Sequence, residues 1–122
     1  MSVQIVDAAY VAAHLENEFL LDLRPEFMYD STHIPGAKNI DFWFLKTQNG
    51  FTLPTRLAGF VTEMGVGAND PIIVYCQSGQ MSTEAVGMLE AQGFTEVRHY
   101  EAGWSDWASD RSRPREETPR NR

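Results

Sequence analysis

One nearly continuous apolar run in the second half of the chain limits the possible folds more than any other feature. After Pro71, residues 72–75 read Ile-Ile-Val-Tyr, and the short segment Cys76–Met81 then leads into a helical pattern. A run without polar alternation is typical of a strand covered on both faces, as in a parallel sheet. The unit therefore predicts a strand, a loop and a helix of an α/β fold.

Short apolar runs and amphipathic stretches alternate along the rest of the chain, which favours the same fold class. Strands are expected at residues 3–6, 19–23, 39–42, 71–75 and 96–100. Helices are expected from about Asp7, after Pro25, from Pro54 to Gly65, and from Ser82 as capping residue to Gly93. Right-handed connections between parallel strands would place helices on both faces of the sheet.

Length and composition are those of one compact domain. The chain has 122 residues, of which 43% are apolar, enough for one buried core and too few for two. We expect this single domain to span residues 1–108. Residues 109–122 are rich in Arg and have no apolar periodicity, so we expect a polar, flexible tail there.

The charge and the single cysteine exclude several classes of protein. A formal charge of −7 argues against a nucleic-acid binder, because contacts with phosphates need clustered Lys and Arg. One cysteine cannot form an intramolecular disulfide, and neither a secretory signal nor an apolar run of roughly 20 residues is visible. We therefore expect a cytoplasmic protein with no nucleic-acid and no membrane partner.

Cys76 lies at the predicted carboxyl end of a buried strand, where open α/β sheets bind their ligands. The following segment contains Gly79, so its backbone N–H groups can curl around the sulfur while the next helix adds partial positive charge. Such a loop stabilises an anion, either a thiolate or a persulfide. The alternative is a buried cysteine that acts only as a small apolar side chain.

Four segments around these residues follow one another in a distinctive order. They are residues 19–27 with Asp22-Leu23-Arg24-Pro25, residues 33–40 beginning His-Ile-Pro-Gly-Ala, residues 75–82 around Cys76, and residues 93–107 ending Gly-Trp-Ser-Asp-Trp. Together they resemble the rhodanese family, above all the catalytic C-terminal domain of tandem thiosulfate sulfurtransferases. The resemblance covers residues 5–108 and implies a doubly wound five-stranded parallel sheet and ping-pong sulfur transfer without a cofactor.

The resemblance also implies roles for individual residues. Cys76 would be the catalytic nucleophile, and Arg24 would bind the anionic group of the donor. Asp22 would order its strand end. Apart from the resemblance, we expect His33 to brace its own turn. The loop that holds the persulfide and the substrate would consist of Gln77, Ser78, Gly79, Gln80, Met81 and Ser82.

The loop departs from the commonest family pattern, which has a cation directly after the cysteine and often another near the loop end. This chain has Gln77 and Met81 at those places. Losing these charges weakens the attraction for a dianion such as thiosulfate by on the order of a kcal/mol each. The donor stays open among thiosulfate, which the resemblance favours, mercaptopyruvate, glutathione persulfide and a protein persulfide. The acceptor would be cyanide or a thiol.

Two other functions compete with this hypothesis. Cysteine phosphatases need an Arg six positions after the cysteine, where this chain has Ser82, so phosphoryl transfer would lack its main electrostatic support. The stronger alternative is a non-enzymatic sulfur relay or interaction module fed by a partner protein. No metal site is expected, because His14, His33 and His99 lie in separate predicted elements.

Overall fold

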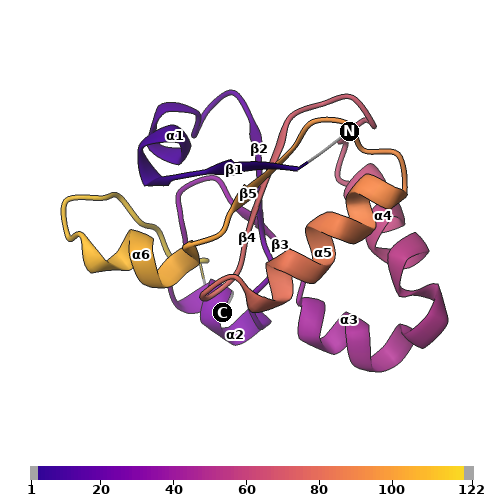
Figure 1. The fold of residues 1–122 in the computed structure, drawn as a ribbon. Coiled ribbons are helices and arrows are strands. Elements are labelled where there is room, and N and C mark those ends of the chain that lie inside the picture. The colour runs from indigo at the N-terminus through magenta and orange to yellow at the C-terminus, as the bar shows by residue number, and fades with distance from the viewer. Residues whose placement is uncertain (1–2, 120–122) are drawn as a thin grey trace.

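A five-stranded parallel sheet forms the centre of the protein in the computed structural model, which describes residues 3–119 (Figure 1). Its strand order is β1-β5-β4-β2-β3, and every pair of neighbours is parallel. The strands are β1 (Gln4–Val6), β2 (Phe19–Asp22), β3 (Lys38–Asn39), β4 (Ile72–Tyr75) and β5 (Val97–Tyr100). The predicted α/β fold class and its five parallel strands are confirmed.

Helices cover both faces of this sheet. They are α1 (Ala8–Ala13), α2 (Glu26–Ser31), α3 (Phe42–Asn49), η1 (Gly50–Thr52), α4 (Leu53–Glu63), α5 (Gln80–Ala91) and α6 (Gly103–Ser109). In Figure 1, α1 and α6 lie on one side of the strands and α3, α4 and α5 on the other. Among residues 3–119, no helix is long and apolar enough to cross a membrane.

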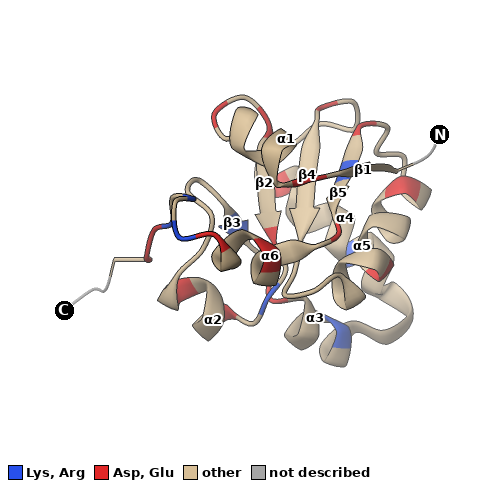
Figure 2. Ribbon diagram, turned by 60° about the vertical axis from the view of Figure 1, so that its left-hand side comes forward, with Lys and Arg blue, Asp and Glu red and all other residues tan. Residues whose placement is uncertain are grey.

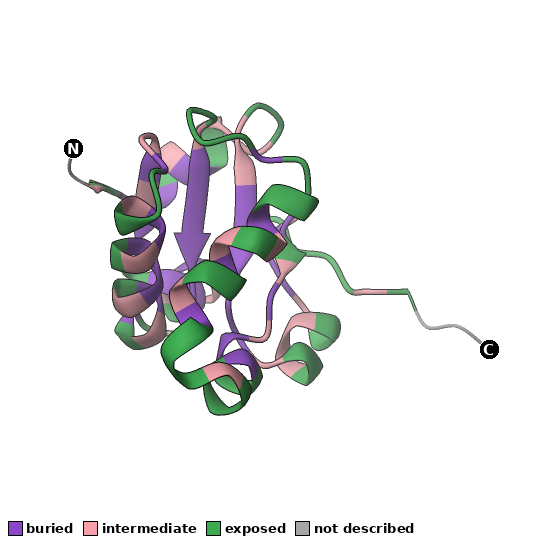
Figure 3. Ribbon diagram, turned by 90° about the vertical axis from the view of Figure 1, so that its right-hand side faces the viewer, coloured by how far each residue is buried: buried purple, intermediate pink, exposed green. Residues whose placement is uncertain are grey.

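Strand β4 runs through the middle of the molecule, and its position explains its unbroken apolar sequence. Side chains of a strand point alternately to opposite faces. Ile72 and Val74 therefore join the core under α3, α4 and α5, whereas Ile73 and Tyr75 join the core under α1 and α6. Figure 3 shows the strands buried between helices whose outer surfaces are exposed. A strand packed on both faces has no position for a polar side chain facing solvent.

Several predicted helix boundaries are those of the structure. Asp7 caps α1 and accepts a hydrogen bond from the Tyr10 backbone N–H at 2.9 Å. Pro54 lies in the first turn of α4, where its missing N–H has no partner to lose. Gly65 and Gly93 follow α4 and α5 with φ of 96° and 97°, a conformation that strongly favours glycine.

Two expected elements differ from those observed. The strand expected at residues 39–42 ends at Asn39, and Asp41 instead caps the unpredicted helix α3 by accepting from the Phe44 N–H at 3.0 Å. Trp43 and Phe44 are exposed, so the apolar residues of α3 do not mark one face. Ser82 does not cap α5, because that helix begins two residues earlier with Gly79 as its cap.

The segment after α6 contacts the body of the protein, although a flexible tail was expected. Residues His33 and Glu116 exchange two backbone hydrogen bonds of 2.9 Å. The Trp107 Nε1–H donates to Pro114 O at 2.8 Å, and the Thr118 N–H donates to Asp30 O at 3.1 Å. Figure 2 shows acidic and basic residues close together along this segment. The end of the expected tail, residues 120–122, lies outside the described residues.

Candidate active site

Cys76 is the first residue after β4, and it lies at the carboxyl edge of the sheet. Strand β4 is flanked there by β2 and β5, so the cysteine sits among the ends of three parallel strands. Its side chain continues the alternation of β4 into the core under α5, and only 2% of the residue is exposed. The thiol is therefore almost fully shielded from solvent.

The loop points two backbone donors at the sulfur. The N–H groups of Gly79 and Ser82 lie 3.2 and 3.3 Å from Cys76 Sγ. Both belong to the cap and first turn of α5, where unpaired N–H groups and the helix dipole carry partial positive charge. The loop can therefore stabilise an anionic sulfur without a charged side chain.

Gly79 makes this geometry possible. Its φ is 98°, and a Cβ atom there would lie 2.6 Å from the carbonyl oxygen of Glu101. Any side chain would thus have to push apart the Cys76 loop and the segment that follows β5. The single glycine of residues 76–82 stands where both the turn and the close packing require it.

Helix α6 holds the loop from the other side. The Trp104 N–H donates to Cys76 O at 2.9 Å, and the Ser105 N–H donates to Gln77 O at 3.0 Å. Gly103 allows this approach, because a Cβ atom there would lie 2.5 Å from Cys76 O. The Gly-Trp-Ser segment noted in the sequence therefore fixes the backbone of Cys76 and Gln77.

A buried serine and histidine extend from the sulfur into the core. The Cys76 thiol donates to Ser82 Oγ at 3.2 Å, and Ser82 Oγ lies 2.6 Å from His99 Nε2. Ser82 is 0% and His99 2% exposed. Burial lowers the pKa of His99 below its usual value, and the nearby Glu101 charge acts in the opposite direction.

His99 was not predicted as a residue of this site, because the three histidines lie far apart along the chain. Strand alternation was the signal that could have found it. His99 is two residues from buried Val97, so it points toward the same face as Ile72, Val74 and Cys76.

Arg24 lies in a buried ion pair at the end of β2. Its Nη2 is 2.9 Å from Asp22 Oδ2, its Nε contacts both carboxylate oxygens, and its Nη2 also donates to Thr32 O at 2.6 Å. The Trp104 ring lies 4.6 Å from the guanidinium carbon. Arg24 is only 1% exposed. The guanidinium expected to bind a donor anion is thus directed at partners within the protein.

Asp22 is fully occupied by this network. It accepts from the Arg24 backbone N–H at 2.8 Å and from the Tyr75 hydroxyl at 2.6 Å, besides the guanidinium. Burial, followed by the Asp22 charge, raises the pKa of Tyr75 well above its usual value, so the phenol stays a donor. The network ties the end of β2 to the end of β4, next to Cys76.

His33 occupies the turn expected for it. Its ring stacks on Tyr29 with centroids 3.9 Å apart, and its Nδ1 lies 2.7 Å from Tyr29 O. Its Nε2 lies 3.5 Å from a carboxylate oxygen of Glu116. The histidine therefore joins α2, its turn and the C-terminal segment, and contacts none of the Cys76 loop.

The remaining loop residues differ in what they contact. The Gln77 amide donates to Ser105 Oγ at 3.1 Å, and Met81 packs against the core beneath α5. Ser78 and Gln80 are exposed. Gly79 and Ser82 thus contact the sulfur directly, whereas Gln77 and Met81 shape the loop around it.

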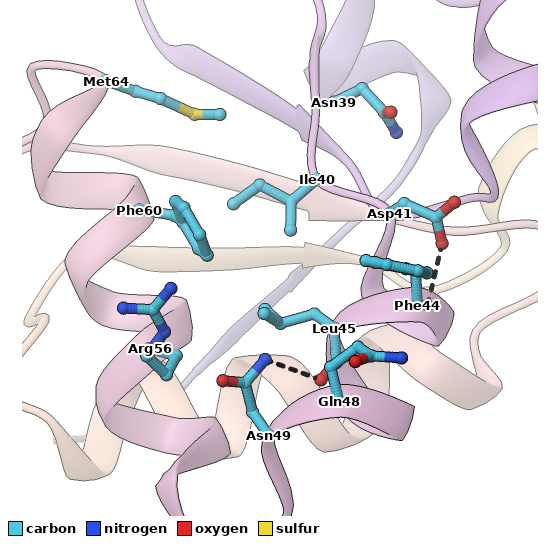
Figure 4. A pocket seen from close by; sticks show the side chains of 10 residues that line it. All are labelled: Asn39, Ile40, Asp41, Phe44, Leu45, Gln48, Asn49, Arg56, Phe60 and Met64. Carbon is cyan, nitrogen blue, oxygen red and sulfur yellow. Dashed lines mark hydrogen bonds between the residues drawn. The ribbon is translucent and has the colours of Figure 1, made fainter.

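Two cavities lie near the same edge of the sheet. One of about 220 Å³ is lined by Arg24, Phe27, Met28, Ser31, Thr32 and Trp104. A larger groove of about 580 Å³ lies between α3 and α4 (Figure 4), lined by Asn39, Ile40, Asp41, Phe44, Leu45, Gln48, Asn49, Arg56, Phe60 and Met64. No residue that lines the larger groove belongs to residues 76–82, so this groove is separate from the Cys76 loop. Within residues 3–119, no cluster of three His, Cys, Asp or Glu could hold a metal ion.

Comparisons with known proteins agree with this geometry. The chain is 29% identical over 79 residues to a putative thiosulfate sulfurtransferase of Haloferax volcanii, which covers 63% of this chain and 28% of the relative. It is 26% identical over 118 residues to the 3-mercaptopyruvate sulfurtransferase of Escherichia coli K12, which covers 88% of this chain and 42% of the relative. The chain thus spans less than half the length of these two curated relatives.

The chain shares its fold with a solved structure and matches a family model over most of its length. The human single-domain sulfurtransferase TSTD1 has a similar fold, with a TM-score of 0.69 at 20% identity over 89% of this chain and 98% of that one. The family model described as a rhodanese-like domain matches residues 7–110, which include both the ion pair of Arg24 and the Cys76 loop. The chain belongs to the rhodanese-like family.

Proposed function

We propose that this protein is a sulfurtransferase in which Cys76 carries a sulfane sulfur as a persulfide. The observation that carries the proposal is the pair of backbone N–H groups, from Gly79 and Ser82, directed at Sγ. A thiolate and a persulfide are both anions, so the same donors support the free and the loaded enzyme. The sulfurtransferase names of the relatives from Haloferax volcanii and Escherichia coli agree with this chemistry.

Transfer proceeds in two displacements at sulfur. The Cys76 thiolate attacks the sulfane sulfur of the donor, forming a new S–S bond while the donor's bond to that sulfur breaks. The electron pair of the broken bond departs with the leaving group, which is sulfite when the donor is thiosulfate. Cyanide or a thiolate then attacks the outer sulfur of the persulfide, and Cys76 leaves as a thiolate.

The charges of the loop bear on the choice of donor. No Lys or Arg occurs from Cys76 to Ser82, and Arg24 is paired with Asp22. We therefore expect thiosulfate, a dianion, to serve as donor with a high KM. Mercaptopyruvate and thiol persulfides carry less charge and depend less on a cation, and they follow thiosulfate as candidates.

A sulfur relay fed by a partner protein is the second candidate. Phe27, at the rim of the small cavity beside Arg24 and Trp104, is 74% exposed. An exposed aromatic side chain next to a reactive edge is a feature of protein-binding surfaces. In this function Cys76 would still carry the sulfur, and a protein persulfide would be its donor.

The transfer of sulfur from thiosulfate to cyanide tests the proposal. Thiocyanate release is measured for the wild type and for Cys76→Ser, and the intact mass of each is recorded after exposure to thiosulfate. We expect turnover only in the wild type, together with a mass gain of about one sulfur atom that cyanide removes. Equal turnover in the serine variant would contradict the proposal. A wild type that neither turns over nor gains mass with thiosulfate, mercaptopyruvate or a thiol persulfide would leave only the relay.

A further inference from the structure

We propose that His99, acting through the hydroxyl group of Ser82, is a positioning residue that accepts the Cys76 proton and sets the pH at which the thiolate forms. The proposal rests on the function proposed above and names the group that accepts the proton of Cys76. It makes the reactive unit a chain of three side chains instead of a lone cysteine in a loop.

The three side chains come from elements that the fold holds rigidly together. Cys76 follows β4, Ser82 lies in the first turn of α5, and His99 lies on β5, where its backbone pairs with Val74 of β4. The two links measure 3.2 Å from Sγ to Ser82 Oγ and 2.6 Å from Oγ to His99 Nε2. Both are hydrogen-bond distances, and the second is short for a bond between a hydroxyl and a nitrogen.

The three side chains can pass one proton from Cys76 to His99 so that each group ends with an allowed number of protons. The thiol gives its proton to Ser82 Oγ as the serine's own proton passes to His99 Nε2. Ser82 ends as a neutral hydroxyl, Cys76 as a thiolate and His99 as an imidazolium. The thiolate then uses its electron pair to form the S–S bond described above, and the imidazolium remains as the counter-charge.

His99 can accept this proton because its ring is neutral beforehand, although the same burial opposes the charged form. Burial lowers its pKa, which favours the neutral ring, and in the tautomer protonated at Nδ1 the Nε2 lone pair accepts from the serine hydroxyl. The ionisable groups that act on it are Cys76, through Ser82, and Glu101, whose charge favours the imidazolium. Its neighbours across the sheet are the apolar Ile5 and Val74.

The loop around Cys76 has no cationic side chain that could stabilise a thiolate. Gln77 and Met81 are uncharged, no Lys or Arg occurs from Cys76 to Ser82, and the guanidinium of Arg24 is paired with Asp22. The positive charge for a thiolate must then come from backbone dipoles or from a group that gains charge as the thiol loses it. His99 is such a group, one hydroxyl away from the sulfur.

Alkylation of Cys76 by iodoacetamide as a function of pH tests the proposal without any sulfur donor. The rate follows the thiolate, so its midpoint pH reports directly on the proton of Cys76. The variants are His99→Gln, which keeps a polar group near Ser82 but cannot be protonated, and Ser82→Ala, which removes the link. His14→Gln, on a partly exposed histidine of the opposite face, is the matched control.

We expect the midpoint to rise by about one pH unit in His99→Gln and in Ser82→Ala, which is roughly tenfold slower alkylation at a fixed pH below it. The double variant should show no further rise, because both changes cut the same chain. His14→Gln should leave the midpoint unchanged. An unchanged midpoint in folded His99→Gln overturns the proposal, as does a full additional shift in the double variant.

A second measurement covers the case in which the variants do not fold. In the wild type, heteronuclear NMR follows the His99 ring through a pH titration before and after S-methylation of Cys76. We expect methylation to change the His99 titration, because coupled groups share their protons. An identical titration overturns the proposal. Sulfur transfer by the wild type is judged separately by thiocyanate release, so turnover without any alkylation shift rejects the role of His99 alone.

Discussion

The ends of β2 and β4 lie side by side at the same edge of the sheet, yet they hold charge in opposite ways. After β2, a full positive and a full negative charge, Arg24 and Asp22, are buried against one another with further hydrogen bonds. After β4, the sulfur of Cys76 faces two backbone N–H groups and one hydroxyl. In the first arrangement Nε and Nη2 of Arg24 are engaged within the protein, whereas in the second the donors around Cys76 converge on a single sulfur atom.

From this contrast we expect the end of β2 to serve stability and the end of β4 to serve the proposed chemistry. A buried ion pair tolerates little change, because removing one partner strands the other charge away from water. Backbone N–H dipoles directed at a sulfur stabilise its negative charge both in a thiolate and in a persulfide. Tyr75 joins the two regions, for it ends β4 and donates to Asp22.

Arg24→Met should give the largest loss of stability. It leaves the Asp22 carboxylate buried without its cation, and we expect the free energy of unfolding to fall by about 3–5 kcal/mol. Urea denaturation measures the change, and the double variant Asp22→Asn with Arg24→Met should recover part of it. In the fraction that stays folded, Cys76 should be alkylated at nearly the wild-type rate. A stable Arg24→Met protein with a strongly raised KM for the donor would instead support the donor-binding role expected for Arg24 from the sequence.

Gly79→Ala should damage the second region more than the first. The new Cβ would meet Glu101 O, and a φ of 98° costs a non-glycine residue about 1–2 kcal/mol before any clash. The clash would displace the Gly79 N–H, which is one of the donors to Sγ. We therefore expect turnover to fall by about 10²-fold as well. Thiocyanate release and urea denaturation measure the two effects.

Gly87→Ala is the matched control for that change. Gly87 lies on the exposed face of α5, its φ is not positive, and a Cβ atom added there would have no other atom within 4 Å. We expect a gain of up to about 1 kcal/mol in stability from the higher helix propensity of alanine, with unchanged turnover. Equal losses of turnover in the two alanine variants would mean that α5 as a whole, and not the loop donor, controls the sulfur.

Much of this arrangement could be predicted from the sequence because it depends on local patterns. The unbroken apolar run 72–75 predicted β4, and the position directly after it placed Cys76 at the carboxyl edge of the sheet. Asp7, Gly65 and Gly93 marked helix ends through backbone requirements that act within a few residues. Each of these signals needs only neighbours along the chain.

The rest depends on contacts between distant segments. Ser82 and His99 are 17 residues apart, and only the pairing of β5 with β4 under α5 brings them together. The Arg24 side chain turns toward the carboxylate of Asp22, two residues earlier. The sequence contains both residues but does not indicate that they bind each other. Glu116 reaches His33 through a turn whose path leaves no periodic signature.

The smallest of these effects concerns the pH dependence of stability and separates His99 from the charged network around Arg24. Because burial lowers the pKa of His99 in the folded state, the unfolded chain binds more protons as the pH falls below the usual value of histidine. The contribution of the neutral ring is therefore fully present above about pH 6.5 and is lost as the pH falls toward the lower folded value. His99→Gln should flatten this part of the curve in urea denaturation between pH 7.5 and pH 5. An acid loss that persists unchanged in His99→Gln would place its origin in a group other than His99.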